Sequence, residues 1–83
     1  MVHENKLDLT EVPWPNSLLM CNRALDKVMA GERLVVVTGD PDVADSIRLM
    51  VKNQGVFTCT ENHDNGTWIL VVRCRRHSDE RMS

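Results

Sequence analysis

The dipeptide Asn65-Gly66 places the strongest constraint on how this chain can fold. Asn-Gly is typical of two-residue hairpin turns, because both residues readily adopt a positive φ. Two runs rich in β-branched and apolar residues, 56–62 and 67–74, flank it. A turn at this dipeptide pairs His63 with Trp68, Glu61 with Leu70, Cys59 with Val72 and Phe57 with Cys74. One face of the predicted hairpin, the core face, then carries Phe57, Cys59, Trp68, Leu70, Val72 and Cys74.

The first third of the chain predicts a short strand followed by a helix. Residues 6–10 alternate, with Leu7 and Leu9 on one face. Pro15 suits the first helical position, where a missing N–H costs nothing. Gly31 suits the left-handed residue that often ends a helix. Apolar residues recur between these two at helical spacing, namely Leu18, Cys21, Leu25, Val28 and Met29.

The middle of the chain predicts a central strand and a second helix. Residues 34–37 form a continuous aliphatic run, which is typical of a strand buried on much of both faces. Asp40 is a good N-cap and Pro41 fits the first turn of a helix. We expect this helix to end at Gly55, with an apolar stripe of Val43, Ile47, Met50 and Val51.

The predicted order is therefore β-α-β-α-β-β, an α+β two-layer sandwich. Right-handed crossovers place both helices on one face of a four-stranded mixed sheet. At 83 residues the chain has room for one domain, 1–83, with an ordered core of about 6–74 and a loose tail over 75–83.

Composition narrows the possible environments and partners. The net charge is −2, which gives no general attraction to nucleic acid or to an anionic membrane. The apolar runs are too short to span a bilayer, and the N-terminus has no apolar segment of signal-peptide type, so we predict a cytoplasmic protein. Three cysteines without CxxC spacing indicate reduced thiols rather than a disulfide scaffold.

A metal site is not predicted, and neither is a cofactor. Cys59, His63, Cys74 and His77 have loosely finger-like spacings. However, the hairpin register places His63 near the turn, and Cys74 and His77 at the far end of the fourth strand. Four to five strand residues of ~3.3 Å each separate these ends, which is too far for one tetrahedral site.

Residues 7–15 read L-D-L-T-E-V-P-W-P and lead directly into the first predicted helix. This segment resembles the signature of the TusA/SirA family of small sulfur-carrier proteins, in which a strand L-D-L-R-G runs into C-P-x-P and a helix. Without a gap, Trp14 stands at the family's persulfide-carrying cysteine. The departures fall in the same segment: Thr10 and Glu11 replace R-G, and Ser17 replaces the second proline.

The resemblance extends over almost the whole chain, from Leu7 to about Cys74. Further matches keep the family's spacing without gaps, namely Gly31-Glu32, Asp40-Pro41, Ile47 and Gly55. The resemblance thus implies the family's fold for this chain. It does not carry over the family's chemistry at position 14, because an indole cannot accept or pass on sulfane sulfur.

The predicted binding site is Pro13, Trp14, Pro15 and Asn16, the segment that enters the first helix. Two interpretations of Trp14 stay open. It can pack over the edge of the sandwich and shield Leu7 or Leu9. It can also be an exposed anchor for another protein, since Trp is the residue type most enriched at binding hot spots. We predict at least partial exposure.

Three functions follow from these observations. The first is a non-catalytic protein-binding or regulatory module, not an enzyme, whose partner belongs to sulfur relay or redox metabolism. The second is a sulfur carrier or sulfurtransferase that uses another thiol, with Cys21 as the alternative catalytic residue, although its place in the apolar stripe indicates a buried side chain. The third is RNA binding, by analogy with the C-terminal domain of a translation initiation factor, against which the acidic balance weighs.

Overall fold

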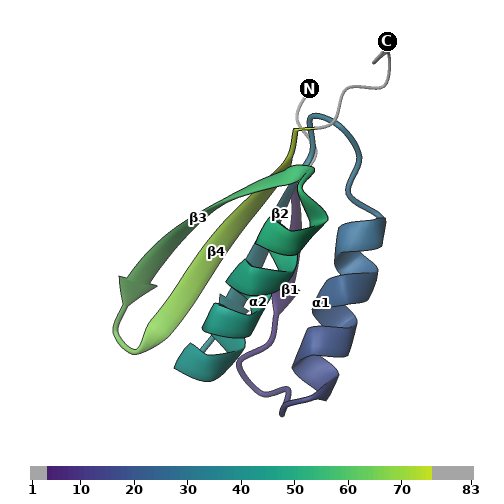
Figure 1. The fold of residues 1–83 in the computed structure, drawn as a ribbon. Helices are drawn as coiled ribbons and strands as arrows, with labels where there is room; N and C mark the ends of the chain where they lie inside the picture. Colours follow the sequence, from purple (N-terminus) through teal and green to yellow (C-terminus); the bar gives the residue numbers. More distant parts are fainter. Residues whose placement is uncertain (1–3, 76–83) are drawn as a thin grey trace, which may run out of the picture.

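The computed structural model describes residues 4–75 and has the predicted order of elements (Figure 1). The elements are β1 (Glu4–Asp8), α1 (Asn16–Asp26), β2 (Arg33–Thr38), α2 (Pro41–Gln54), β3 (Phe57–Asp64) and β4 (Thr67–Cys74). The sheet order is β1-β2-β4-β3, with β1 parallel to β2 and the other neighbours antiparallel. Apart from Arg75, the predicted tail lies outside the described residues.

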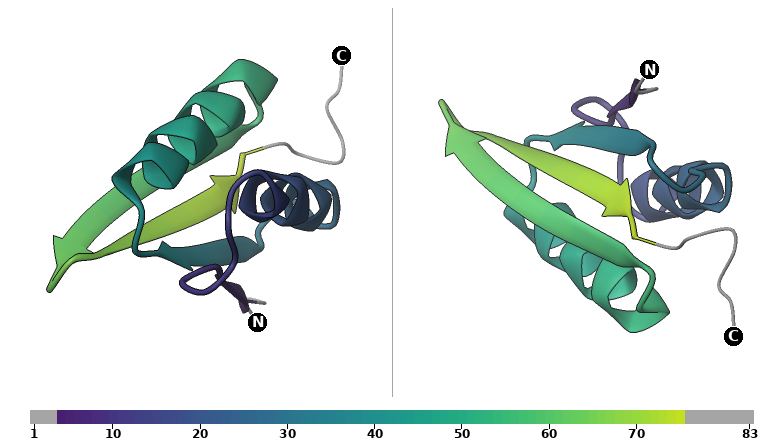
Figure 2. Two further views of the ribbon diagram at one scale, coloured as in Figure 1. Left: turned by 90° about the horizontal axis from the view of Figure 1, so that it is seen from below. Right: turned by 90° about the horizontal axis from the view of Figure 1, so that it is seen from above.

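Both helices lie on one face of the sheet, so the molecule has two layers (Figure 2). The core fills the space between the layers. Its most deeply buried side chains come from all parts of the chain, namely Leu9, Cys21, Leu25, Leu34, Val36, Ile47, Val51, Leu70 and Val72. None of the described helices is long and apolar enough to cross a membrane.

The hairpin has the predicted turn and register. Asn65 and Gly66 have φ values of 52° and 77°, as a tight hairpin turn of this type requires. All four predicted cross-strand pairs are confirmed. Near the turn, His63 and Trp68 stack with their ring centroids 4.0 Å apart.

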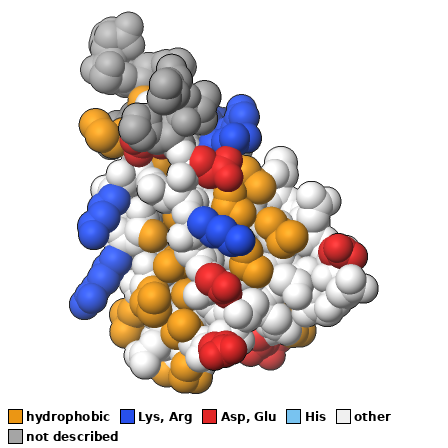
Figure 3. Space-filling view, turned by 180° about the vertical axis from the view of Figure 1, so that it is seen from behind, with side chains coloured by type: hydrophobic (Ala, Val, Ile, Leu, Met, Phe, Trp, Pro, Cys, Tyr) orange, Lys and Arg blue, Asp and Glu red, His pale blue; other side chains and the backbone are white. Residues whose placement is uncertain are grey.

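The central strand β2 alternates in burial, whereas the sequence predicted burial on much of both faces. Leu34, Val36 and Thr38 are buried, but Val35 and Val37 are partly exposed. The reason is that the helices cover only one face of the sheet. Seen from behind, the uncovered face shows hydrophobic side chains among charged ones (Figure 3). Its partly exposed apolar residues on β2 and β4 are Val35, Val37, Ile69 and Val71.

The predicted end of the first helix was wrong. Helix α1 ends at Asp26, and the N–H groups of Lys27 and Val28 close the last turn on the carbonyls of Ala24 and Leu25. Beyond Val28 the chain turns back toward the sheet. The Met29 N–H donates to Oε1 of Glu32 at 2.9 Å, and the Glu32 N–H donates to the carbonyl of Met29 at 2.9 Å. Gly31, with φ 86°, instead belongs to the turn into β2.

The last residues of the first predicted helix and strand also lie outside the observed elements. Met29 lies beyond α1 and is 68% exposed, so its assignment to the apolar stripe was wrong. Strand β1 spans Glu4–Asp8 rather than 6–10. Leu9 still belongs to the core, because its N–H donates to the carbonyl of Val37 at 2.7 Å and its side chain is buried.

Both predicted ends of the second helix are confirmed. The Asp40 side chain accepts a hydrogen bond from the Asp42 N–H at 2.9 Å, and Pro41 is the first helical residue. Gly55 ends the helix with φ 74°. Helix α2 therefore begins directly after β2, at the same end of the sandwich as the start of α1 (Figure 1).

The hairpin turn gives a testable prediction. Gly66→Ala should lower the free energy of unfolding by about 1 kcal/mol, since a residue with a Cβ pays for a left-handed φ. A Cβ at Gly66 would meet no atom within 4 Å, so the cost is one of backbone conformation alone. Gly39→Ala is the matched control, because its Cβ would make only an ordinary 3.9 Å contact and no positive φ is required. Urea unfolding measures both variants, and an equal loss in the two would contradict this role of the turn.

Candidate functional site

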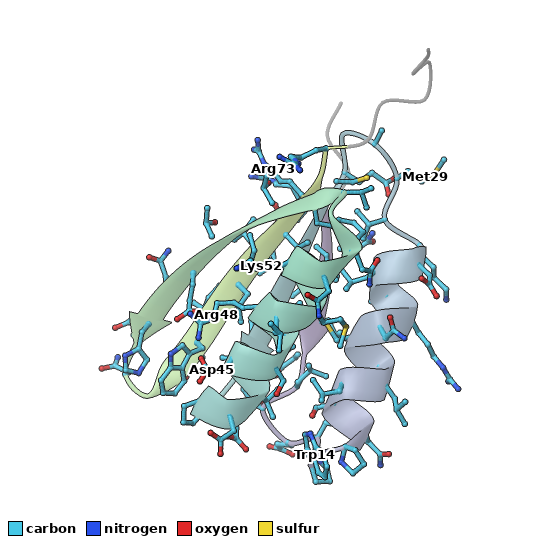
Figure 4. All side chains as sticks on the ribbon, in the orientation of Figure 1. Trp14, Met29, Asp45, Arg48, Lys52 and Arg73 are labelled. Carbon is cyan, nitrogen blue, oxygen red and sulfur yellow. The ribbon has the colours of Figure 1, made fainter. Side chains whose placement is uncertain are left out.

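An open groove lies at the end of the sandwich where the chain leaves β1 and β2 and enters the two helices. Trp14 stands at this end, at the base of α1 (Figure 4). The groove is lined from the β1–α1 loop by Leu9, Thr10, Glu11, Val12, Pro13 and Trp14, and from the β2–α2 loop by Thr38, Gly39 and Asp40. The indole of Trp14 is 64% exposed, so most of its surface faces solvent.

The β1–α1 loop is held by short-range hydrogen bonds. The backbone N–H and the Oγ1 hydroxyl of Thr10 both donate to Oδ1 of Asp8, at 3.0 and 2.6 Å. These two bonds lower the pKa of the Asp8 carboxyl below its usual value. The N–H of Val12 donates to the carbonyl of Leu9 at 3.1 Å, which closes a second turn. The loop that carries Trp14 is thus folded on itself rather than extended.

Proline precedes α1 as predicted, but the helix begins one residue later than expected, at Asn16. Pro15 is the N-cap rather than the first helical residue, and the Trp14–Pro15 peptide bond is cis. The N–H of Ser17 donates to the carbonyl of Pro13 at 3.1 Å, and that of Leu18 to the carbonyl of Pro15. Two of the first helical N–H groups are therefore already bonded to loop carbonyls.

The second wall of the groove was missed by the sequence prediction. Thr38 is buried, and its Oγ1 accepts a hydrogen bond from the N–H of Asp40 at 3.2 Å. The charged side chains in the lining, Glu11 and Asp40, are both acidic. Strand pairing is the signal that could have found this wall. If the first two strands pair in parallel, their carboxyl ends lie at the same end of the sheet and the loops that follow them are neighbours.

Only two of the four predicted binding residues line the groove. Pro13 and Trp14 line the groove. Pro15 and Asn16 are exposed beside it at the start of α1 but do not line it. The alternative residue Cys21 lies further along α1 and is 0% exposed.

The three cysteines are all free thiols. Burial raises the pKa of the Cys21 thiol to about 11, and the Cys59 thiol adds to the shift. Burial also raises the pKa of Cys59, which is partly buried against the core, as is Cys74. A raised pKa leaves the thiol protonated and weakly nucleophilic at neutral pH.

Within residues 4–75, no three His, Cys, Asp or Glu side chains are grouped so that they could hold a metal ion. The register places Cys59 and Cys74 toward one end of the hairpin, and His63 beside Trp68 next to the turn. His77, the fourth residue of the finger-like spacing, lies outside the described residues.

A comparison with protein-family models matches residues 5–74 to the family described as sulfurtransferase TusA. Searches of curated proteins and of solved structures found no match to this chain. The matched range runs from β1 to the last residue of β4 and includes both walls of the groove.

The buried thiol of Cys21 gives a prediction for alkaline pH. Its pKa is 9.0 in the unfolded chain and about 11 in the folded one, so the unfolded chain loses the proton first as the pH rises. The stability that the protonated thiol contributes is complete below pH 9 and is lost between about pH 9 and about pH 11. Cys21→Ala removes this titration, and its free energy of unfolding should fall less steeply over that range.

Urea unfolding of both proteins at several pH values from about 8 to about 11 measures the difference. Other groups titrate equally in the two proteins, so the comparison isolates Cys21. Parallel pH profiles would show that the thiol is not shielded in the folded chain.

Proposed function

Because the chain belongs to the TusA sulfurtransferase family, we propose that it is a member without the sulfur-carrying thiol, acting as a non-catalytic protein-binding or regulatory module. The observation that carries this proposal is the exposed indole of Trp14 on the rim of the groove. In the ungapped comparison with the family signature, Trp14 takes the place of the persulfide cysteine. The partner is a cytoplasmic protein of sulfur relay or redox metabolism.

The chemistry of sulfur transfer supports the loss of carrier activity. A persulfide carrier needs an accessible thiolate, which a helix N-terminus stabilises through its free N–H groups and its dipole. Trp14 offers no sulfur atom. The loop carbonyls of Pro13 and Pro15 also occupy N–H groups of the first turn of α1. An exposed indole beside an open groove suits contact with a protein surface better than transfer of a sulfur atom.

The alternative carrier, Cys21, is disfavoured by its surroundings. A carrier thiol must reach the sulfur of a donor protein and then that of an acceptor. Cys21 is buried on the core side of α1, and its pKa is raised to about 11. Such a thiol would need local unfolding of the helix before it could react.

The groove also indicates the chemistry of the partner. An exposed indole contributes a large rigid area to an interface and binds best in a complementary apolar pocket. Glu11 and Asp40 add negative charge beside it, with no Lys or Arg among the lining residues. We therefore expect a partner with an apolar pocket flanked by Lys or Arg, and the acidic lining weighs against RNA at this site.

Sulfur uptake separates a binding module from a carrier. The wild-type protein and Trp14→Cys are each incubated with a protein persulfide donor and weighed intact by mass spectrometry. The wild type should gain no sulfur. Trp14→Cys restores a thiol at the helix entry and should gain one sulfur atom, as the donor persulfide is converted to a thiol. A gain of one sulfur on a cysteine of the wild-type protein would contradict the proposal.

Binding gives the second prediction for Trp14. Trp14→Ala should weaken the complex with a physiological partner by about 2 kcal/mol or more, roughly thirtyfold in Kd, as at an interface hot spot. The variant should lose at most about 0.5 kcal/mol of folding stability, because an exposed side chain has little packing to lose. Leu19→Ala is the matched control, since Leu19 is also exposed and apolar but does not line the groove.

Proteins retained on the immobilised wild type and on Leu19→Ala, but lost on Trp14→Ala, are the candidate partners, and titration calorimetry then gives the Kd values. The affinity should also fall as salt is added, because the acidic lining contributes to association. Large destabilisation of Trp14→Ala with unchanged binding would show that the indole has a packing role instead.

A further inference from the structure

Strand β3 is an edge strand of the sheet, and no other described strand pairs with its outer side. It has eight residues and pairs with β4 without a bulge. It contains no proline and no lysine, the residues that commonly protect edge strands from pairing. The other edge strand, β1, has five residues, three of them charged. The two edges therefore differ sharply in how readily they accept another strand.

The hydrogen-bonding groups on the open side of β3 can be identified from the register. The N–H of Arg75 donates to the carbonyl of Val56 at 2.7 Å, so the backbone of Val56 faces β4. Because antiparallel pairs alternate, residues 58, 60, 62 and 64 also face β4. The backbone groups of the residues between them, Phe57, Cys59, Glu61 and His63, point outward from the sheet.

We propose that β3 pairs antiparallel with β3 of a second copy of this chain, with Thr60 on the twofold axis. In this register Cys59 lies opposite Glu61 of the second copy, and Phe57 lies opposite His63. All four outward-facing residues of each chain then form hydrogen-bonded pairs with each other. The product is one continuous sheet of two four-stranded halves, and the interface is self-complementary, as a twofold axis requires.

The side chains on β3 are compatible with this register. Thr60 would face Thr60 across the axis on the uncovered face of the sheet, and Thr–Thr is a favourable cross-strand pair. Phe57, opposite His63 in this register, stays buried in the core of its own copy. No carboxylate of β3 lies directly opposite another, because Glu61 faces Cys59. The two Glu61 residues are diagonal neighbours across the axis, and each is paired with Arg48 of its own copy.

Helix α2 brings charged side chains close to the same axis. Its Asp45, Arg48 and Lys52 side chains lie on the flank toward the hairpin (Figure 4). Arg48 pairs with Asp45 and, through Nε at 2.9 Å, with Glu61 of β3, so Arg48 lies near the level of Thr60. A twofold axis at that level runs the two α2 helices antiparallel and brings Asp45 of one copy toward Lys52 of the other. The two Arg48 side chains lie nearest the axis, and each is neutralised by Asp45 and Glu61 of its own copy. Unlike charges, Asp45 and Lys52, are opposed on either side of them.

This inference is independent of the proposed function. The sheet order places β3 at the opposite edge from β1. Trp14 and the groove follow β1, so pairing through β3 leaves both grooves uncovered. The test below uses no residue of the groove.

Disulfide trapping tests the register. Thr60→Cys places two thiols opposite each other at a non-hydrogen-bonded position, where the Cα atoms of antiparallel strands are ~4.5 Å apart, within the range of a disulfide. Under mild oxidation we expect rapid formation of a disulfide dimer linked through position 60, identified by peptide mass spectrometry. Thr58→Cys, on the same face of the same strand, is the control, because position 58 would face Asn62 and should not cross-link to itself.

Charge exchange tests the interface in solution. Thr60 is exposed, so Thr60→Lys and Thr60→Glu should both fold, which circular dichroism checks. Each variant alone places like charges across the axis and should raise the dimer dissociation constant by about tenfold or more in sedimentation equilibrium. An equimolar mixture of the two should recover the dimer. Asn22→Lys adds the same charge on the exposed side of α1 and should dimerise like the wild type.

Two results would overturn the proposal. One is a wild-type protein that stays monomeric up to millimolar concentration. The other is a dimer that neither Thr60→Lys nor Thr60→Glu weakens and that does not cross-link through position 60, since its interface would then lie elsewhere.

Discussion

The parallel pairing of β1 with β2 determines where the groove beside Trp14 lies. Parallel neighbours have their carboxyl ends at the same end of the sheet, so the loops that leave them emerge side by side. Each loop leads into a helix on the same face. The start of α1, the start of α2 and the groove between their loops are therefore consequences of one strand pairing. The antiparallel hairpin β3–β4 completes the sheet, and its turn lies at the same end, where Trp68 pairs with Thr38 of the groove wall.

The sequence predicted the hairpin register and the limits of α2, but it placed the end of α1 at the wrong residue. The hairpin register followed from Asn65-Gly66, because a two-residue turn leaves no freedom in the pairing. The limits of α2 followed from the cap at Asp40 and the left-handed Gly55. The end of α1 did not follow from Gly31, since a positive φ serves a turn as well as a helix end. The bonds between Met29 and Glu32 close that turn, and the spacing of apolar residues does not reveal them.

Some features of the candidate site followed from the sequence, and others did not. The burial of Cys21 followed from its place in the helical stripe, because helical spacing fixes which side of a helix a residue faces. The predicted exposure of Trp14 is confirmed, since its side chain is 64% exposed, although residues 7–15 do not say whether the indole packs or binds a partner. The wall formed by Thr38, Gly39 and Asp40 is distant in sequence from Trp14 and becomes its neighbour only through the sheet. A site built from two loops is visible in sequence only once the strand pairing is known.

The two proposals combine into a specific geometric expectation. A twofold axis through Thr60, perpendicular to the sheet, reverses the strand direction between the two copies. The two grooves would therefore open at opposite ends of the continuous sheet and at its outer edges, with both Trp14 side chains free. One partner surface could not reach both grooves at once, so dimerisation would add no avidity for a monomeric partner. It would instead allow the protein to bring two partner molecules together, each bound through one indole, which is a bridging role that a single-site carrier does not have.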